Sequence, residues 1–325
     1  MTSPDVLARV TDQMRAVLDT QAELAADAFA TDVDLTVMRR RYAAERAFWN
    51  EGGPVMAATV DGVVPGPFGP IAIRAHRPVP ADHDLPCIVY VHGGGFVVGD
   101  LDTHDRIMRT LAACTGAVVV GVDYRLSPES KFPGAVHECA AVVSHLGVHG
   151  GELGIDPAHV SLAGDSGGAN LAMATTLYLR DEVPGSPSVE CLILYYGMFG
   201  LRDSASQRLF GGEWDGMAKA DLDYYLDCYT TGPADLASPY LDCLGADLSH
   251  GVPPCYVAAS ALDPLLDDSL ALATVLDDLG VHRRLRVFEG VLHGFLHHSR
   301  MLPEAVQALE DGADFYRGVL AAVTT

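Results

Sequence analysis

The chain has 325 residues, and its 43 Asp and Glu outnumber 21 Lys and Arg, which gives a formal net charge of −22 at pH 7. The length predicts one main domain with an accessory piece rather than two equal domains. A charge this negative repels nucleic acid and anionic membrane surfaces, so we expect neither as a partner.

Seven cysteines are spread along the chain, and no Cys-x-x-Cys motif occurs. An odd number at wide spacing argues against a disulfide framework and against a zinc or iron–sulfur site. No apolar run is long enough to span a bilayer, and we predict no signal peptide, because a basic region followed by an apolar stretch is lacking at the start. We therefore expect a cytoplasmic protein without membrane insertion.

Two helices are predicted before the first strand. Residues 3–18 place apolar side chains on one helical face, with Ser3 as the cap and Pro4 at the first helical position. A second helical pattern covers residues 36–49. We interpret residues 1–50 as N-terminal cap helices.

From Pro70 onwards, short apolar runs alternate with helical segments. Strands are predicted at 71–77, 87–91, 117–122, 159–163, 190–195, 255–259 and 284–288, and helices at 104–114, 135–149, 167–181, 265–279 and 303–320. This alternation is typical of an α/β fold with a mostly parallel central sheet flanked by helices. The run near 57–64 and the strand at 71–77 are expected to form an antiparallel edge.

The interval between Tyr196 and Cys255 breaks the alternation. An insertion of this length in an α/β sheet is typical of a lid over the site. We expect a catalytic domain at 51–325 with a cap insertion at about 197–235, which covers the site together with residues 1–50. The bulky aromatic side chains expected to close a pocket there are Phe48, Trp49, Phe199 and Trp214.

The segment Gly164-Asp165-Ser166-Gly167-Gly168 lies between a predicted strand and a predicted helix. It matches G-x-S-x-G, whose serine sits on a sharp strand-to-helix turn, and glycines permit such a turn. A serine hydroxyl becomes a nucleophile when a histidine removes its proton and a carboxylate orients that histidine. We predict Ser166 as the nucleophile.

Asp263 and His293 are the predicted acid and base, in that order along the chain. Both follow the carboxyl ends of predicted strands, where a parallel sheet places its active site. Asp267 and Asp268, one turn further on, are interpreted as charges at a helix N-terminus. His293 and His297 have the i, i+4 spacing of a metal pair. Because no acidic residue lies between them and a loop is expected there, we predict no metal.

The segment His92-Gly93-Gly94-Gly95 directly follows the strand at 87–91. A glycine triplet at such a turn can aim several backbone N–H groups at one point, where the N–H of Gly167 also points. A phosphate-binding loop would need a following Lys-Ser/Thr pair, which is lacking. We predict an oxyanion hole, with Gly93, Gly94 and Gly167 as the donors.

These motifs together carry a family resemblance. HGGGF (92–96), DYRLSPE (123–129), GDSGG (164–168), DPL (263–265) and HGF (293–295) resemble the hormone-sensitive-lipase-like group of α/β hydrolases, which includes bacterial esterases. Residues 101–109, 200–204, 263–269 and 295–301 narrow the likeness to bacterial acetyl esterases.

The resemblance implies an eight-stranded sheet with a helical cap, and hydrolysis of short-chain acyl esters without a cofactor. It maps the nucleophile, acid and base to Ser166, Asp263 and His293, and the oxyanion motif to His92, Gly93 and Gly94. Asp123, Arg125 and Glu129 are expected to brace the loops beneath the site. The family often has alanine where this chain has Gly167.

Other functions stay open at this point. An amidase, a lactonase or a deacetylase can use the same three residues, and related folds also serve as non-catalytic ligand-binding proteins. A protein-interaction role for the acidic surface is a further alternative. The expected partner is a small-molecule ester, and the oligomeric state is left open between a monomer and a homodimer.

Overall fold

The computed structural model describes residues 5–25, 27–212 and 214–323. Its centre is an eight-stranded sheet in the order β1-β2-β4-β3-β5-β6-β7-β8. β1 pairs antiparallel with β2, β2 pairs antiparallel with β4, and the other neighbours are parallel. The predicted fold class is therefore confirmed. The strands are β1 (Ala58–Gly66), β2 (Gly69–Arg77), β3 (Leu85–Val91), β4 (Val118–Asp123), β5 (Ile155–Asp165), β6 (Val189–Tyr195), β7 (Cys255–Ser260) and β8 (Arg283–Phe288).

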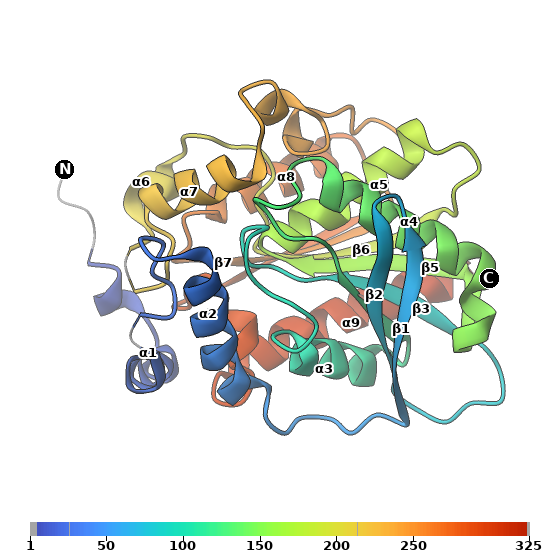
Figure 1. Cartoon of the computed structure of the whole chain (residues 1–325), viewed down its shortest axis with the longest axis horizontal. Helices are drawn as coiled ribbons and strands as arrows, with labels where there is room; N and C mark the ends of the chain where they lie inside the picture. The colour runs from blue at the N-terminus through green and yellow to red at the C-terminus, as the bar shows by residue number, and fades with distance from the viewer. Residues whose placement is uncertain (1–4, 26, 213, 324–325) are drawn as a thin grey trace.

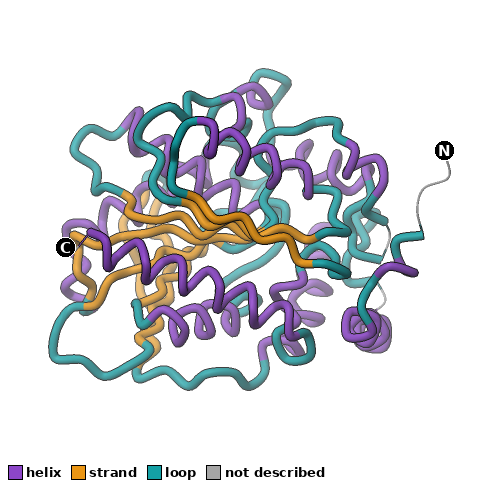
Figure 2. Tube along the Cα trace, turned by 180° about the vertical axis from the view of Figure 1, so that it is seen from behind, coloured by secondary structure: helices purple, strands orange, loops and turns teal. Residues whose placement is uncertain are grey.

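Helices cover both faces of the sheet (Figures 1 and 2). α3 (Asp105–Thr115) and α9 (Pro303–Val323) pack on one face, and α4 (Gly134–His149), α5 (Gly167–Glu182) and α8 (Leu266–Asp278) pack on the other. Because both faces are covered, the central strands are apolar on both sides. In β3, Val89 and Val91 join the core under α4 and α5, while Ile88 and Tyr90 join the core under α3 and α9.

The first predicted helix is broken in two, so its prediction as one element over 3–18 was wrong. A 3-10 turn, η1 (Leu7–Arg9), precedes α1 (Asp12–Ala25), and Val10 between them is extended. The Thr11 N–H donates to the Gly290 carbonyl at 2.9 Å, and the Thr11 hydroxyl accepts from the Met14 N–H at 3.1 Å, which caps the new helix. Ser3 and Pro4 lie outside the described residues.

The N-terminal helices and the insertion after β6 lie at the same end of the molecule (Figure 1). α2 (Leu35–Asn50) contributes Met38 and Tyr42 to a small core with Val97 and Val98, and Tyr225 of α7 (Lys219–Tyr229) packs against it. Val97 and Val98 belong to the loop that follows β3, so this core joins α2 and α7 to that loop. The insertion also contains α6 (Ala205–Leu209), η3 (Asp235–Ala237) and η4 (Cys243–Gly245). Elsewhere in the chain, η2 (Gly150–Leu153) precedes β5, and η5 (Phe295–His298) precedes α9.

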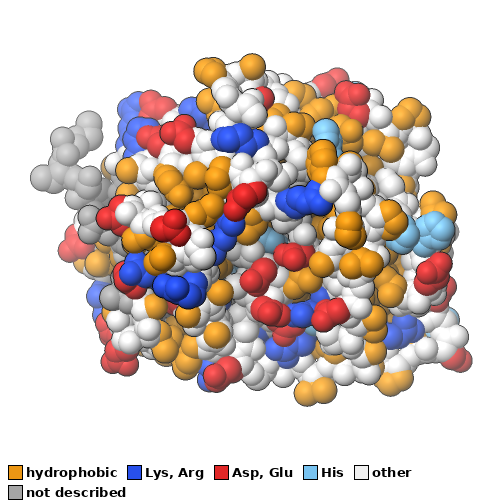
Figure 3. Space-filling view, viewed as in Figure 1, with side chains coloured by type: hydrophobic (Ala, Val, Ile, Leu, Met, Phe, Trp, Pro, Cys, Tyr) orange, Lys and Arg blue, Asp and Glu red, His pale blue; other side chains and the backbone are white. Residues whose placement is uncertain are grey.

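Basic and acidic side chains are interspersed on the face seen in Figure 3, so this face carries no continuous basic patch. None of the helices in the described part of the chain combines the length and the apolar character needed to cross a membrane.

Candidate active site

Ser166 occupies a strained turn between β5 and α5. Its φ of 54° and ψ of −124° lie where non-glycine residues are rare. A Cβ on Gly164 would lie 2.3 Å from the Gly168 carbonyl oxygen, and a Cβ on Gly168 would lie 2.1 Å from the Val91 carbonyl oxygen. The close approach of these backbones therefore requires glycine at both positions, and the turn presents Ser166 at the carboxyl edge of the sheet.

Ser166, His293 and Asp263 are joined by two hydrogen bonds. His293 Nε2 lies 2.8 Å from Ser166 Oγ, and His293 Nδ1 lies 2.8 Å from Asp263 Oδ2. Asp263 is fully buried, and its other oxygen accepts from the Leu265 N–H at 2.8 Å. Burial lowers the pKa of His293, but the charge and hydrogen bond of Asp263 outweigh it, so the pKa lies above its usual value. The fold thus brings together three residues that are far apart in sequence.

Because both ring nitrogens of His293 have these partners, it does not pair with His297 as a metal ligand. His297 is buried, and its Nε2 lies 4.0 Å from Asp165 Oδ2. His104, Asp165 and His297 form a buried group of residue types that bind metals. Asp165, however, already accepts from the Tyr90 hydroxyl at 2.8 Å and the Gly93 N–H at 3.0 Å. Its contacts are therefore those of a residue that holds the neighbouring loop.

The glycine loop after β3 differs from its prediction at two residues. The Gly93 N–H donates to Asp165, so it does not point at the serine, and Gly93 is not the donor we expected. His92 is buried against Tyr124 with a ring separation of 4.3 Å, and burial lowers its pKa to about 4, so the ring is neutral. Both residues support the glycine loop and do not line the cavity in front of Ser166.

Gly94, Gly95 and Gly167 line the cavity in front of Ser166. Positive φ values of 113° and 58° at Gly94 and Gly95 turn the chain sharply here. A Cβ on Gly94 would lie 2.2 Å from the Val98 carbonyl oxygen, so the turn requires glycine. Among the hydrogen bonds between described residues, none is donated by the N–H groups of these three glycines. These donors are left available to a ligand in the cavity.

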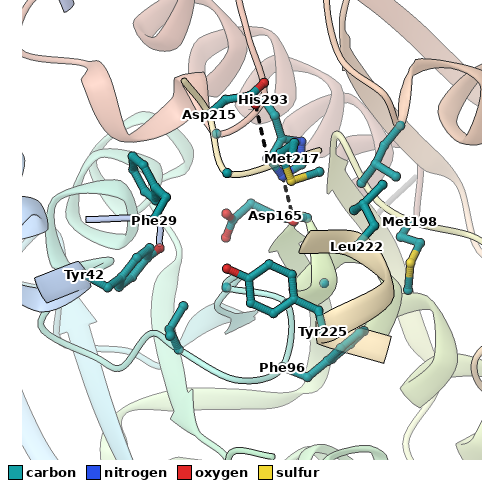
Figure 4. A pocket seen from close by; sticks show the side chains of 18 of the residues that line it. Phe29, Tyr42, Phe96, Asp165, Met198, Asp215, Met217, Leu222, Tyr225 and His293 are labelled. Carbon is teal, nitrogen blue, oxygen red and sulfur yellow. Dashed lines mark hydrogen bonds between the residues drawn. The ribbon is translucent and has the colours of Figure 1, made fainter. Parts of the chain in front are cut away.

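The cavity is small and mostly apolar (Figure 4). The space open to the centre of a water molecule is about 80 Å³. Figure 4 shows Phe29 and Tyr42 on one side of His293, and Met198 and Leu222 on the other. The remaining apolar side chains of the lining are Phe96, Val98, Met217, Tyr225, Leu226 and Leu265.

The aromatic residues expected to close this pocket are therefore not the ones that do so. Phe199 is fully buried, and Trp49 packs against His298 with a ring separation of 4.6 Å. Neither these two nor Phe48 and Trp214 line the cavity. The aromatic rings that line the cavity are those of Phe29, Tyr42, Phe96 and Tyr225.

Asp268 has a role that the sequence did not indicate. It is fully buried, and its Oδ1 accepts from three successive N–H groups, those of Phe199 at 2.7 Å, Gly200 at 3.0 Å and Leu201 at 3.2 Å. It thereby fastens the start of the insertion to α8. Burial raises its pKa to about 6, despite these hydrogen bonds. The interpretation of Asp268 as only a helix charge was incomplete.

Two of the three expected bracing residues hold loops around the site. Arg39 of α2 pairs with Glu129 at 2.7 Å and also donates to the Val97 carbonyl at 2.8 Å, so it ties α2 to the loop that follows β3. Arg125 pairs with the buried Glu138 at 3.3 Å. Asp123, at the end of β4, is exposed, so its expected bracing role has no counterpart among the described residues.

The elbow at Ser166 and the mostly parallel sheet are those of an α/β hydrolase. A family model described as alpha/beta hydrolase fold matches residues 88–297. The chain belongs to this family, and the resemblance to its hormone-sensitive-lipase-like group is confirmed.

Relatives and solved structures agree with this assignment. Proteins named acetyl esterase from Salmonella paratyphi B and Salmonella choleraesuis are each 42% identical over 311 residues, which cover 96% of this chain and 95% of the relative. An esterase from the archaeon Pyrobaculum calidifontis aligns with a TM-score of 0.88 and 32% identity over 96% of this chain and 99% of its own. A thermostable carboxylesterase from a metagenomic library aligns with a TM-score of 0.84 and 31% identity over 89% of this chain and 98% of its own.

Proposed function

We propose that this protein is a serine carboxylesterase that hydrolyses short acyl esters, acetyl esters above all, through a covalent acyl-enzyme. The observation that carries the proposal is the pair of 2.8 Å contacts that joins Ser166, His293 and Asp263 at the bottom of an apolar cavity. The acetyl and carboxyl esterase names of the relatives support it.

In this proposal, Ser166 Oγ attacks the ester carbonyl carbon while His293 Nε2 takes its proton. Asp263 holds the imidazole in the correct orientation and stabilises its charged form. His293 then donates that proton to the leaving alkoxide oxygen, and the acyl group stays on Ser166. A water molecule, activated by His293, attacks the acyl carbon and releases the acid.

The oxyanion formed in each half-reaction needs donors that are already in place. We assign this role to the N–H groups of Gly94, Gly95 and Gly167, because all three line the cavity. Gly93 is replaced in this role, since its N–H is bonded to Asp165.

A short acyl chain suits the apolar side chains close to Ser166. Phe96, Met198 and Leu265 are among those that line the cavity there. A series of esters from acetate to decanoate tests this part of the proposal. We expect kcat/KM to be highest at the short end, and a maximum at long chains would contradict it.

We further propose that residues 1–50 and about 197–235 act as the cap over the catalytic domain. The packing of Met38 and Tyr42 with Tyr225 above Val97 and Val98 supports this. A cytoplasmic location is supported by the seven cysteines, all of which are free thiols, because thiols persist in reducing compartments.

The variant Ser166→Ala tests the nucleophile. We expect it to lose hydrolysis of p-nitrophenyl acetate by a factor on the order of 10⁵ or more, with an unchanged circular dichroism spectrum. Ser188→Ala, at an exposed serine far from the cavity, is the matched control and keeps full activity. Substantial turnover by Ser166→Ala would refute the assignment, and binding of the ester without turnover by the wild type would indicate a receptor instead.

A further inference from the structure

Asp215 brings a carboxylate with one unpartnered oxygen to the cavity. It lies in the loop between α6 and α7, where its Oδ1 accepts from the Gly212 N–H at 3.1 Å and the Met217 N–H at 3.2 Å. Its Oδ2 is buried and has no hydrogen-bond partner among the described residues. Figure 4 shows Asp215 beside His293, at one end of the cavity.

Arg46 of α2 is a second charged residue of the cavity lining. Its side chain is buried, and its Nη1 pairs with Glu45 Oε2 at 2.8 Å. Its Nε is buried and has no acceptor within the described part of the chain. Arg46, Asp215 and His293 all line the cavity in front of Ser166, and they also line a smaller adjoining cavity of about 40 Å³.

The position beside His293 decides which part of a substrate Asp215 can meet. In the proposed reaction, His293 gives its proton to the oxygen of the leaving alcohol, so that oxygen must lie within hydrogen-bond distance of His293. An alcohol that extends past His293 on the side of Asp215 brings its other atoms to this carboxylate (Figure 4). A buried acceptor without a partner is unfavourable unless a ligand pairs with it. A hydroxyl group can do so, since it donates to a carboxylate.

An outer cavity of about 660 Å³ lies next to the smaller one, and Phe29 and Trp214 line both. The lining of the outer cavity includes the polar side chains of Arg15, Asp19 and Thr31. Polar groups therefore lie close to the end of the site where Asp215 and His293 are found.

We propose that Asp215 forms a subsite for a second hydroxyl group on the leaving alcohol, so that the preferred substrates are acyl esters of diols, glycerol or sugars that keep a free hydroxyl. This inference rests on the proposed esterase function and assigns its alcohol specificity. Asp215 positions the substrate and takes no part in bond breaking.

Four acetates of matched size test the proposal. 2-Hydroxyethyl acetate has the size of propyl acetate, and 2-methoxyethyl acetate has the size of butyl acetate. At about pH 8, where Asp215 is charged, we expect the wild type to hydrolyse the hydroxyethyl ester with a kcat/KM about 10-fold or more above that of propyl acetate, because the carboxylate accepts its hydroxyl. The methoxyethyl ester is expected to show no such advantage over butyl acetate, because an ether oxygen cannot donate.

Asp215→Asn is the informative variant. Its amide oxygen keeps the acceptor for Gly212 and Met217, while its amide nitrogen replaces the unpartnered Oδ2. We expect the ratio of kcat/KM for hydroxyethyl over propyl acetate to fall by about 5-fold or more. The matched control is Asp223→Asn, at an exposed residue of α7 that pairs with Lys219 at 2.8 Å, and it keeps the wild-type ratio.

The outcomes separate this inference from the esterase proposal. Hydrolysis of all four esters with equal efficiency, or an unchanged ratio in Asp215→Asn, overturns the subsite and leaves the esterase function standing. Hydrolysis of none of them, with the wild type folded, overturns the esterase function itself. The hydroxyl and ether comparison needs only the wild type, so it decides the question even if the variant does not fold.

Discussion

The buried charge of Asp215 has a consequence for stability that can be measured without substrate. Burial raises the pKa of Asp215 from 3.8 to about 7. Its Oδ2 has no partner among the described residues, and the two backbone N–H groups at Oδ1 do not compensate for the loss of water. Asp215→Asn keeps the acceptor for those N–H groups and removes the charge.

The size of the effect follows from the two pKa values. The difference between about 7 and 3.8 is about 3 pH units, and each unit corresponds to about 1.4 kcal/mol. Because the pKa is higher in the folded state, the favourable contribution of Asp215 is complete below pH 3.8 and is lost as the pH rises through about 7. The asparagine variant does not titrate. Its advantage in the free energy of unfolding is therefore small near pH 4 and grows to as much as about 4 kcal/mol above pH 7.

Urea denaturation of the wild type, Asp215→Asn and Asp223→Asn at about pH 5 and about pH 8 measures this difference. We expect the advantage of Asp215→Asn over the wild type to be larger by on the order of 2–3 kcal/mol at the higher pH. Asp223→Asn is the control for the loss of one surface charge, and it should show no comparable dependence. A difference that does not change with pH, or an asparagine variant that is less stable at the higher pH, would refute the reasoning.

Further predictions concern the catalytic groups. Asp263→Asn should lower kcat by about 10⁴-fold in steady-state kinetics, because the imidazole loses the group that orients it; a loss below 10-fold would contradict this role. In a pH series, kcat/KM should fall on the acid side with an apparent pKa above the usual value for histidine, since Asp263 raises the pKa of His293 and a protonated His293 cannot accept the Ser166 proton. Gly94→Ala should lower kcat by about 100-fold or more, because its Cβ would lie 2.2 Å from the Val98 carbonyl oxygen. Gly167→Ala should keep most of the activity, because its N–H stays in place, and should change the free energy of unfolding by no more than about 1 kcal/mol in urea titrations, because the gain from alanine at a helical position is offset by a tight contact of 3.3 Å between its Cβ and Phe96 Cε1; inactivity of this variant would contradict the expectation that residue 167 needs only its N–H.

Much of the fold could be predicted from the periodicity of apolar residues alone. Each predicted strand from 71–77 onward has a counterpart in the sheet, because strands covered on both faces are apolar throughout and are separated by helices. The first helix was mispredicted for a tertiary reason. Thr11 leaves the helical path to bond Gly290, a residue from the other end of the chain, and no local pattern at 3–18 records that contact.

The candidate site also has residues that the sequence predicted and residues that it did not. Ser166, Asp263 and His293 each follow the end of a strand, and the parallel order of the sheet carries all three ends to one edge, so sequence position was sufficient to name them. Gly93 was named wrongly as a donor because its N–H direction depends on the side chain of Asp165, which comes from β5. Asp215 was not predicted, because the sequence around it resembles that of any polar turn.

The sequence by itself determined the succession of strands and helices along the chain, the serine turn and the candidates for the acid and the base, because these depend on neighbouring residues and on a regular sheet. Only the tertiary structure decided which backbone N–H groups in the described part of the chain stay free, which side chains of α2 and the insertion face the cavity, and that Asp215 lies beside His293. The physical reason is that burial and hydrogen-bond partnership are properties of the packed chain. A carboxylate in a loop is solvated until another segment removes its water, and residues from α2 and the insertion do so here.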